Sequence, residues 1–171
     1  MNKLWWLFVP VMVTLFTLLA FGLTSDPKKI PSPLINKPFP VINGYDLAGN
    51  NVSLGGKAKP RVINFWASWC ASCRAEHRVL LRSAKRFAGK VELIGINYKE
   101  KQQIDGRNWL RRLGNPYVWS FDDQSGRMGL ELGVVAVPET FFVNSEGIIV
   151  HKIAGPLSDE TIANGIEMII K

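Results

Sequence analysis

The amino-acid sequence predicts an α/β fold in which a mixed β-sheet lies between two layers of helices. Short runs rich in β-branched and aromatic residues alternate along the chain with longer stretches whose apolar residues recur at helical spacing. This alternation is typical of parallel strands joined by right-handed helical crossovers. The last two short runs are separated only by the turn residues 145–147, which predicts a closing hairpin. The sheet should therefore combine parallel and antiparallel strands and have helices on both faces.

The predicted domain begins with a β-hairpin at residues 41–54, which turns at residues 48–51. A buried strand at residues 61–66 follows, and a helix at residues 70–88 then ends at Gly89. The inner face of this helix should be formed by His77, Leu80, Leu81, Ala84 and Phe87. Further strands are expected at residues 91–97, 118–121, 140–144 and 148–154, and further helices at residues 104–113 and 129–132.

The last predicted helix begins after Ser158, a residue type that caps helix N-termini well. Asp159 and Glu160 stand in its first turn, where the helix dipole favours negative charge. Its apolar residues recur at helical spacing, and those expected to face inward are Ile162, Ile166, Ile169 and Ile170.

The N-terminal segment differs in composition from the rest of the 171-residue chain, because residues 4–23 carry no charged side chain. A helix rises 1.5 Å per residue, so this segment would extend over about 30 Å, the thickness of the hydrocarbon core of a bilayer. We therefore expect residues 1–23 to form an N-terminal transmembrane anchor. A cleaved signal peptide is the alternative, since Lys3 precedes the apolar run. The length of the run and the aromatic pair Trp5–Trp6 favour an uncleaved signal-anchor.

A proline-rich segment follows at residues 24–40, with lysines between its five prolines. Such a composition disfavours both helix and sheet, so this segment is predicted to be an extended tether. Residues 41–171 then form the α/β domain, which is long enough to bury a sizeable core.

The chain carries a net charge of +7. Part of the positive charge recurs at helical spacing, at Arg74, Arg78, Arg82 and Lys85, and is best explained as a solvated helix face. No recognised nucleic-acid-binding motif accompanies the charge, so nucleic acid is not an expected partner.

The only two cysteines, Cys70 and Cys73, are three residues apart between the predicted strand at residues 61–66 and the helix that follows. At this spacing on the first turn of a helix, the two sulfurs can reach each other. Cys70 should meet the free N–H groups and the positive end of the helix dipole, which stabilise a thiolate. Because a thiolate is the attacking species in disulfide exchange, the motif predicts a redox-active pair.

Three other interpretations of the cysteine pair are weaker. A structural disulfide usually closes a long loop, whereas this pair closes a very short one. A zinc site could combine both cysteines with His77, but the only other histidine is His151, and structural zinc usually takes four ligands. The pair is not a haem-attachment motif, because Arg74 stands where that motif needs histidine.

Four segments resemble a known family. Residues 63–73, INFWASWCASC, resemble thioredoxin-like proteins, and residues 73–77, 113–117 and 137–141 are similar to the CcmG family, also called DsbE, of cytochrome c maturation. The apolar N-terminus fits this family too, and the resemblance covers essentially the whole chain. It implies a thioredoxin-like three-layer α/β/α fold with a mixed β-sheet and an N-terminal β-hairpin, preceded by one transmembrane helix.

The resemblance also implies a function and a place in the cell. The chain would be a protein thiol–disulfide oxidoreductase of cytochrome c biogenesis, anchored in the bacterial inner membrane by a single span, with its thioredoxin-like domain in the periplasm. It would reduce disulfides of apocytochrome c or of a thiol partner in the maturation system. A membrane electron donor of the DsbD or CcdA type would reduce it again. No cofactor or metal is implied besides the redox-active disulfide Cys70–Cys73.

Residue roles follow by matching positions within these motifs. Cys70 matches the attacking cysteine, preceded by Trp69, and Cys73 matches the resolving one. Pro138 matches a cis-proline that faces the pair and exposes the backbone of Val137 to an extended substrate.

Acidic residues around the pair are also implied. Glu76 and Glu139 match acidic positions characteristic of the family, whereas Asn64 stands where ordinary thioredoxins have a buried aspartate. Because asparagine cannot accept a proton, we expect Glu76 and Glu139 to lie near each other and to handle the proton of Cys73 together. In the simpler alternative both are solvated surface acids.

Two further functions remain open from the sequence. The chain could be a general membrane-anchored thiol reductase or oxidant, because the residues between the cysteines do not determine the direction of exchange. It could also be a non-catalytic holdase that binds apocytochrome beside Pro138. Loss of function in a Cys70→Ser variant would separate an enzyme from a holdase.

Overall fold

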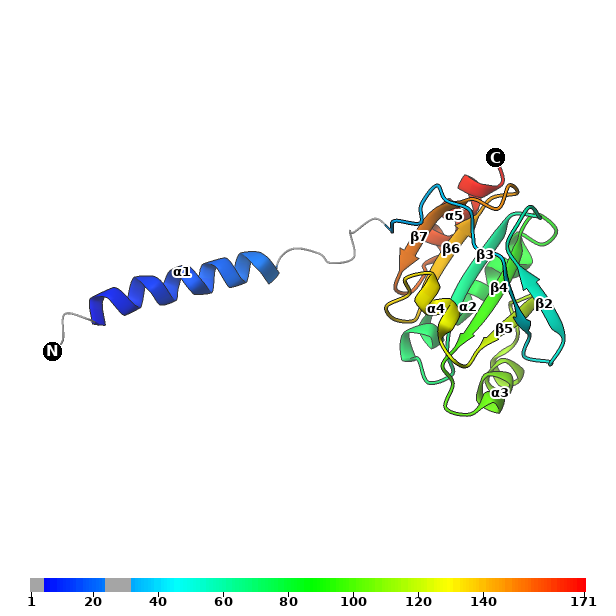
Figure 1. Ribbon diagram of the computed structural model, residues 1–171, viewed down its shortest axis with the longest axis horizontal. Helices are drawn as coiled ribbons and strands as arrows, with labels where there is room; N and C mark the ends of the chain where they lie inside the picture. The colour runs from blue at the N-terminus through cyan, green and yellow to red at the C-terminus, as the bar shows by residue number, and fades with distance from the viewer. Residues whose placement is uncertain (1–4, 24–31) are drawn as a thin grey trace. The chain divides into compact units, whose positions relative to one another are not determined.

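A five-stranded mixed sheet lies at the centre of residues 32–171 in the computed structural model, which describes residues 5–23 and 32–171 (Figure 1). The order across the sheet is β5–β4–β3–β6–β7. The strands are β3 (Arg61–Trp66), β4 (Glu92–Tyr98), β5 (Trp119–Asp123), β6 (Glu139–Val143) and β7 (Ile149–Ala154). Strands β3, β4 and β5 run parallel, whereas β6 is antiparallel to both β3 and β7. A separate antiparallel hairpin pairs β1 (Ile42–Tyr45) with β2 (Asn51–Leu54). The predicted mixed sheet and N-terminal hairpin are confirmed.

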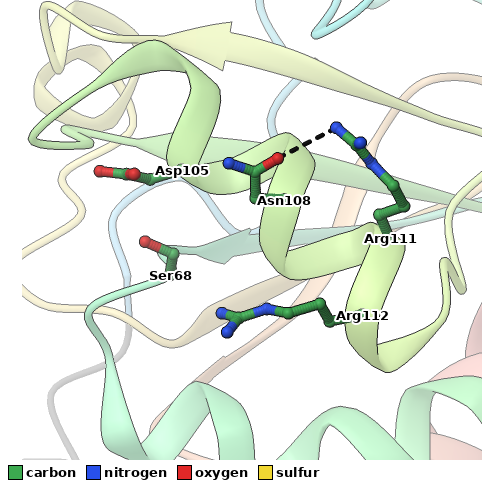
Figure 2. Close-up of a pocket in the computed structure, with 5 residues that line it drawn as sticks. All are labelled: Ser68, Asp105, Asn108, Arg111 and Arg112. Carbon is green, nitrogen blue, oxygen red and sulfur yellow. Dashed lines mark hydrogen bonds between the residues drawn. The ribbon is translucent and has the colours of Figure 1, made fainter.

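Helices cover both faces of this sheet. Helices α2 (Ala71–Arg86), α3 (Gln103–Leu113) and α5 (Asp159–Ile169) contribute to a core cluster that contains Trp66, Leu80, Trp109, Phe142 and Ile166. The short helix α4 (Arg127–Glu131), the β1–β2 hairpin and Phe39 contribute to a second cluster with Phe65 and Phe141. Because neighbouring residues of a strand point to opposite faces, Phe141 and Phe142 belong to different clusters. A pocket of about 410 Å³ lies between α3 and Ser68 (Figure 2).

Local signals place the ends of the two helices that matter most for the site. Cys70 is the N-cap residue of α2, and Gly89, just beyond this helix, adopts a positive φ of 78°. Ser158 caps α5, since its side chain accepts the N–H of Thr161. Ile170 was expected to face inward but is 39% exposed, because it is the C-cap residue, beyond the last turn of α5.

Residues 32–40, the C-terminal part of the predicted tether, lie along the edge of the domain. The N–H of Asn36 donates to the carbonyl of Ile149 at 2.8 Å, and the N–H of Phe39 donates to the carbonyl of Gly147 at 2.8 Å. The Phe39 side chain is only 2% exposed. Residues 24–31, the remainder of the predicted tether, lie outside the described residues.

The N-terminal unit contains helix α1, Trp5–Leu23, with Pro10 inside it. Of the helices that the structure describes in residues 5–23 and 32–171, none is long and apolar enough to cross a membrane. This finding does not support the transmembrane helix predicted within residues 1–23, and the prediction of a single-pass protein of the inner membrane with a periplasmic domain is therefore wrong.

Candidate active site

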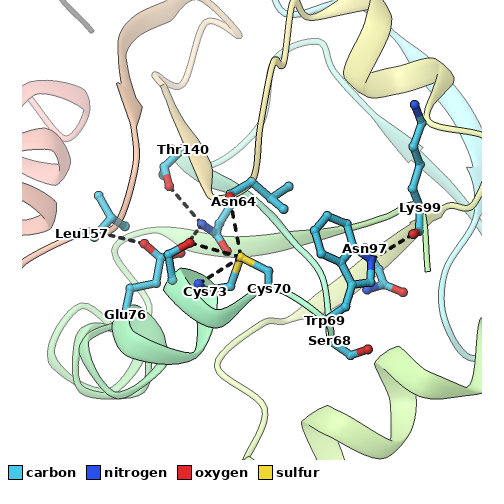
Figure 3. The surroundings of a disulfide bond; sticks show 12 residues. Asn64, Ser68, Trp69, Cys70, Cys73, Glu76, Asn97, Lys99, Thr140 and Leu157 are labelled. Atoms are coloured by element: carbon cyan, nitrogen blue, oxygen red, sulfur yellow. Dashed lines mark hydrogen bonds between the residues drawn. A yellow bond between two sulfur atoms is a disulfide. The ribbon is translucent and has the colours of Figure 1, made fainter. Parts of the chain in front are cut away.

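Cys70 and Cys73 form a disulfide at the start of α2 (Figure 3). The sulfur of Cys70 accepts the backbone N–H of Cys73 at 3.1 Å and lies 3.5 Å from the carbonyl oxygen of Val137. Cys70 is 5% exposed and Cys73 is 1% exposed. Once the bond is reduced, the helix N-terminus would stabilise negative charge on Cys70 more than on the deeper Cys73.

The loop before Cys70 is held by the segment that follows β4. The carboxylate of Glu100 accepts the N–H of Ser68 at 2.6 Å, the hydroxyl of Ser68 at 2.7 Å and the Nδ2–H of Asn97 at 2.7 Å. The indole N–H of Trp69 donates to the carbonyl of Lys99 at 3.0 Å (Figure 3). Trp69 is 49% exposed, so its ring remains available to a partner beside the disulfide.

A chain of buried polar groups lies under the start of α2. Glu76 is 1% exposed and accepts the Nδ2–H of Asn64 at 2.9 Å and the backbone N–H of Leu157 at 2.7 Å. Asn64 also donates to the hydroxyl of Thr140 at 3.0 Å and accepts the hydroxyl of Tyr117 at 2.7 Å. Figure 3 shows the carboxylate of Glu76 directed toward the carboxamide of Asn64. Every member of this chain therefore has a partner from a different element.

Burial governs the titration of these groups. Desolvation raises the pKa of Glu76 to about 7, and the hydrogen bonds from Leu157 and Asn64 oppose that shift. The pKa of Tyr117 is raised well above its ordinary value, mainly by burial and also by the nearby charge of Glu76. Tyr117 therefore stays a hydrogen-bond donor at neutral pH, whereas Glu76 can gain or lose a proton there.

Pro138 and Glu139 begin the other side of the site. The Val137–Pro138 peptide bond is cis, as the resemblance implied. Glu139 is 4% exposed and lies 2.6 Å from the ammonium group of Lys152, and it accepts the N–H of Val135 at 3.0 Å.

The structure does not bring Glu139 beside Glu76. Thr140 reaches Asn64 on the face of the sheet that α2 covers, so the neighbouring Glu139 points to the opposite face. The expected pair of adjacent carboxylates is therefore absent from the described residues, and neither acid is a solvated surface group.

His77 has a structural environment. Its Nε2 lies 3.0 Å from the carbonyl oxygen of Gly114, and its ring packs edge-on against Trp109 at 4.3 Å between centroids. Burial lowers its pKa, which favours the neutral ring. Within residues 5–23 and 32–171, no three side chains of histidine, cysteine, aspartate or glutamate are grouped so that they could hold a metal ion.

Comparison with known proteins agrees with this geometry. A match to the Redoxin family covers residues 34–167. The thiol:disulfide interchange protein DsbE of Allochromatium vinosum is 40% identical over 163 residues, which cover 94% of this chain and 88% of the relative. DsbE of Pseudomonas aeruginosa is 42% identical over 152 residues, covering 87% and 80%, and DsbE of Escherichia coli is 39% identical over 138 residues, covering 78% and 72%.

The chain belongs to the DsbE family of thiol:disulfide interchange proteins. It is therefore a protein thiol–disulfide oxidoreductase, and the intrinsic Cys70–Cys73 pair is its redox group. Solved structures support the thioredoxin-like fold. A DsbF homologue from Corynebacterium diphtheriae superposes with a TM-score of 0.70 at 22% identity, covering 84% of this chain and 96% of that one. StoA from Bacillus subtilis gives 0.64 at 20% identity, covering 78% and 98%.

Several residues of the site have no signal in the sequence. Tyr117 lies in one of the segments that resemble the family, but its bond to Asn64 depends on strands that are far apart in the chain. Glu100 and Lys152 are ordinary charged residues in sequence, but Glu100 is buried against the loop before Cys70 and the half-buried Lys152 pairs with Glu139. The only available hint for Glu100 is that it is a charged residue shortly after a buried strand.

Proposed function

We propose that Cys70 attacks the substrate disulfide and that Cys73 resolves the mixed disulfide. The observation that carries this assignment is the position of Cys70 as the N-cap of α2, where its sulfur accepts the N–H of Cys73. A helix N-terminus lowers the pKa of a cysteine and makes it the better nucleophile.

The exchange would proceed in two displacements. The Cys70 thiolate bonds to one substrate sulfur, and the other substrate sulfur leaves as a thiolate. Cys73 then gives up its proton, its sulfur bonds to that of Cys70, and the first substrate sulfur is released. The substrate disulfide gains two electrons, and the protein keeps the Cys70–Cys73 disulfide.

Glu76 is the group that we assign to the proton of Cys73. It lies one helical turn after Cys73, with a pKa raised to about 7, so it can take up and release a proton near neutrality. Asn64 holds the carboxylate in place but cannot itself accept a proton. For Glu139 we propose a positioning role, since it holds the backbone of Val135 close to the cis-proline.

The proposed substrates are disulfides of apocytochrome c, or of a thiol partner in the cytochrome c maturation system. The support is the resemblance of residues 73–77, 113–117 and 137–141 to that family. The Cys70–Cys73 disulfide formed in each turnover would be reduced again by a dithiol donor of the DsbD or CcdA type.

A trapping experiment tests this function. A Cys73→Ala variant in the native organism should accumulate a mixed disulfide through Cys70, and mass spectrometry should identify apocytochrome c or a maturation partner in it. A Cys70→Ala variant is the matched control and should trap nothing. Recovery of unrelated thiol proteins alone would favour a general reductase, and full function of a Cys70→Ser variant would favour a holdase.

A further inference from the structure

A surface pocket borders the loop that leads into the active site. Its volume is about 410 Å³, and it is lined by Ser68 together with four residues of α3, which are Asp105, Asn108, Arg111 and Arg112 (Figure 2). Ser68 precedes Cys70 by two residues, and two residues of chain extend over at most about 7 Å. The pocket therefore lies within reach of a polypeptide whose cysteine is bonded to Cys70.

The charge inside the pocket is unbalanced. In the part of the chain that the structure describes, neither Arg111 nor Arg112 belongs to an ion pair. Arg111 donates to the side-chain oxygen of Asn108 at 3.0 Å, which leaves its other N–H groups free for a ligand. The one acidic lining residue, Asp105, already accepts the N–H of Gln102 at 3.2 Å and so caps the start of α3. Two guanidinium groups and one carboxylate thus line the pocket, which leaves it with a net positive charge.

Helix stability explains only part of this arrangement. Arg111 and Arg112 lie in the last turn of α3, where positive charge is favourable to the helix dipole. The helix dipole would be stabilised by these arginines wherever they pointed, so it does not explain why they line a pocket together with the loop that carries Cys70. Helix α2 adds further positive charge nearby. His77 of α2 contacts Gly114 at the end of α3, and Arg74 and Arg78, which are close to His77 on α2, are exposed.

We infer that this pocket binds an acidic side chain of the partner polypeptide while the partner's cysteine is bonded to Cys70. Arginine is well suited to this role because its planar guanidinium can bind a carboxylate through two parallel hydrogen bonds. An extended chain advances about 3.3 Å per residue, so the acidic residue should lie about two to four positions from the reacting cysteine. This inference rests on the disulfide-reductase role proposed above, to which it adds a substrate preference.

Matched peptides test the inference on the full chain. Each oxidised peptide carries one Cys-x-x-Cys disulfide and one test residue, which is aspartate, asparagine or lysine. In the first series the test residue lies three positions before the first cysteine, and in the second series it lies three positions after the second cysteine. In one of the two series, the KM for the aspartate peptide should be about fivefold lower than that for the asparagine peptide, with kcat unchanged. The lysine peptide should have the highest KM, and added salt should reduce the differences.

Variants assign the preference to the pocket. The double variant Arg111→Gln/Arg112→Gln should reduce all three peptides with the KM of the asparagine peptide. Arg112→Glu should invert the order, so that the lysine peptide has the lowest KM, an outcome that a purely structural role would not produce. Lys85→Gln/Lys90→Gln removes the same charge near the far end of α2 and should keep the preference for aspartate.

The possible outcomes separate the two proposals. Equal KM values for all peptides with the parent protein, at normal kcat, would overturn the acidic subsite and leave the reductase role intact. A preference for aspartate that survives in the Arg111→Gln/Arg112→Gln variant would also overturn it. Failure to reduce any peptide, together with failure to form mixed disulfides, would instead count against the reductase role.

Discussion

At the scale of single residues, Glu76 is a buried carboxyl group whose two oxygens both accept N–H donors, from Asn64 and from Leu157. These bonds favour the ionised form, whereas burial opposes it, and burial is the larger effect because the pKa rises from 4.5 to about 7. Between these two values the folded protein holds a proton that the unfolded chain has released. The stabilisation is therefore complete below about pH 4.5 and is lost as the pH rises through about 7.

Glu76→Gln should abolish this component of the pH dependence. In the parent, ionisation of Glu76 should lower the free energy of unfolding by about 3 kcal/mol between pH 4.5 and pH 8. Glutamine has a single acceptor oxygen, so below about pH 4.5 the variant should be less stable than the parent by about 1–3 kcal/mol, and this deficit should shrink as the pH rises and the parent loses stability. Urea unfolding measured across this pH range distinguishes the slope from the offset. Glu160→Gln, at an exposed position, should keep the parent slope, and an unchanged slope in Glu76→Gln would show that burial does not control this carboxyl.

The same substitution tests the proton role of Glu76. The rate at which the mixed disulfide is resolved should rise with pH around 7 in the parent, as Glu76 becomes able to accept a proton. In Glu76→Gln that rise should be lost, and resolution at neutral pH should be slower by about 10- to 100-fold. Stopped-flow measurement of thiol release from a preformed mixed disulfide gives this rate directly, and parent-like kinetics would remove Glu76 from the mechanism.

Glu100 illustrates how one residue can position the redox loop without contacting a substrate. Its carboxylate binds both the N–H and the hydroxyl of Ser68, two residues before Cys70. Glu100→Gln replaces a charged acceptor by a neutral amide and weakens these hydrogen bonds, so the free energy of unfolding should fall by about 2 kcal/mol and alkylation of reduced Cys70 should change in rate. Ser68→Ala removes only the hydroxyl bond and should cost about 1 kcal/mol. Equal stability of Glu100→Gln and the parent would contradict this role.

At the scale of secondary-structure elements, the packing of α3 against β4 depends on a glycine. A Cβ atom at Gly106 would lie 2.4 Å from the side-chain oxygen of Asn97. Asn97 is 1% exposed, and its Nδ2–H donates to Glu100. The close approach of helix and strand therefore supports the same carboxylate that holds the redox loop.

Gly106→Ala should destabilise the protein even though alanine is the better helix former. The propensity gain is about 1 kcal/mol, whereas overpacking a buried contact typically costs about 1–3 kcal/mol, so we expect a net loss of about 1 kcal/mol. Asn164→Ala, at an exposed position of α5, receives the propensity gain alone and should be slightly stabilised. Thermal or urea unfolding of both variants checks the comparison, and a stabilised Gly106→Ala would mean that Asn97 can move aside freely.

At the scale of the whole molecule, the chain separates into two compact units, residues 1–31 and 32–171. The two hydrophobic clusters are built from residues in the second unit, including Phe39, and among the described residues none comes from α1. The N-terminal boundary of the folding unit should therefore lie before Phe39.

Two truncations test this boundary. Removal of residues 1–31 should change the free energy of unfolding by less than about 0.5 kcal/mol. It should change the rate of disulfide reduction by less than about twofold. Removal of residues 1–40 deletes the buried Phe39 ring and three backbone hydrogen bonds to the segment Gly147–Ile149, and should cost about 3–5 kcal/mol. Equal stability of the two truncated proteins would place the boundary after residue 40 instead.

Much of the fold and part of the site could be predicted from local sequence patterns. The strand Arg61–Trp66, the cysteine pair at the start of a helix and the Ser158 cap agree with the structure. Each depends on residues within a few positions of one another, where β-branched runs, helical spacing and capping side chains act directly on the backbone.

Only the tertiary structure decided which polar groups meet. Glu76 accepts from Leu157, 81 residues away, and Glu139 binds Lys152 on the opposite face of the sheet. The pocket brings Ser68 next to α3. The sequence predicted a membrane span, but among the described residues no helix is long and apolar enough to cross a membrane. The physical reason is that burial, charge pairing and pKa depend on the face to which a side chain points and on what packs against it, and neither property is local in the sequence.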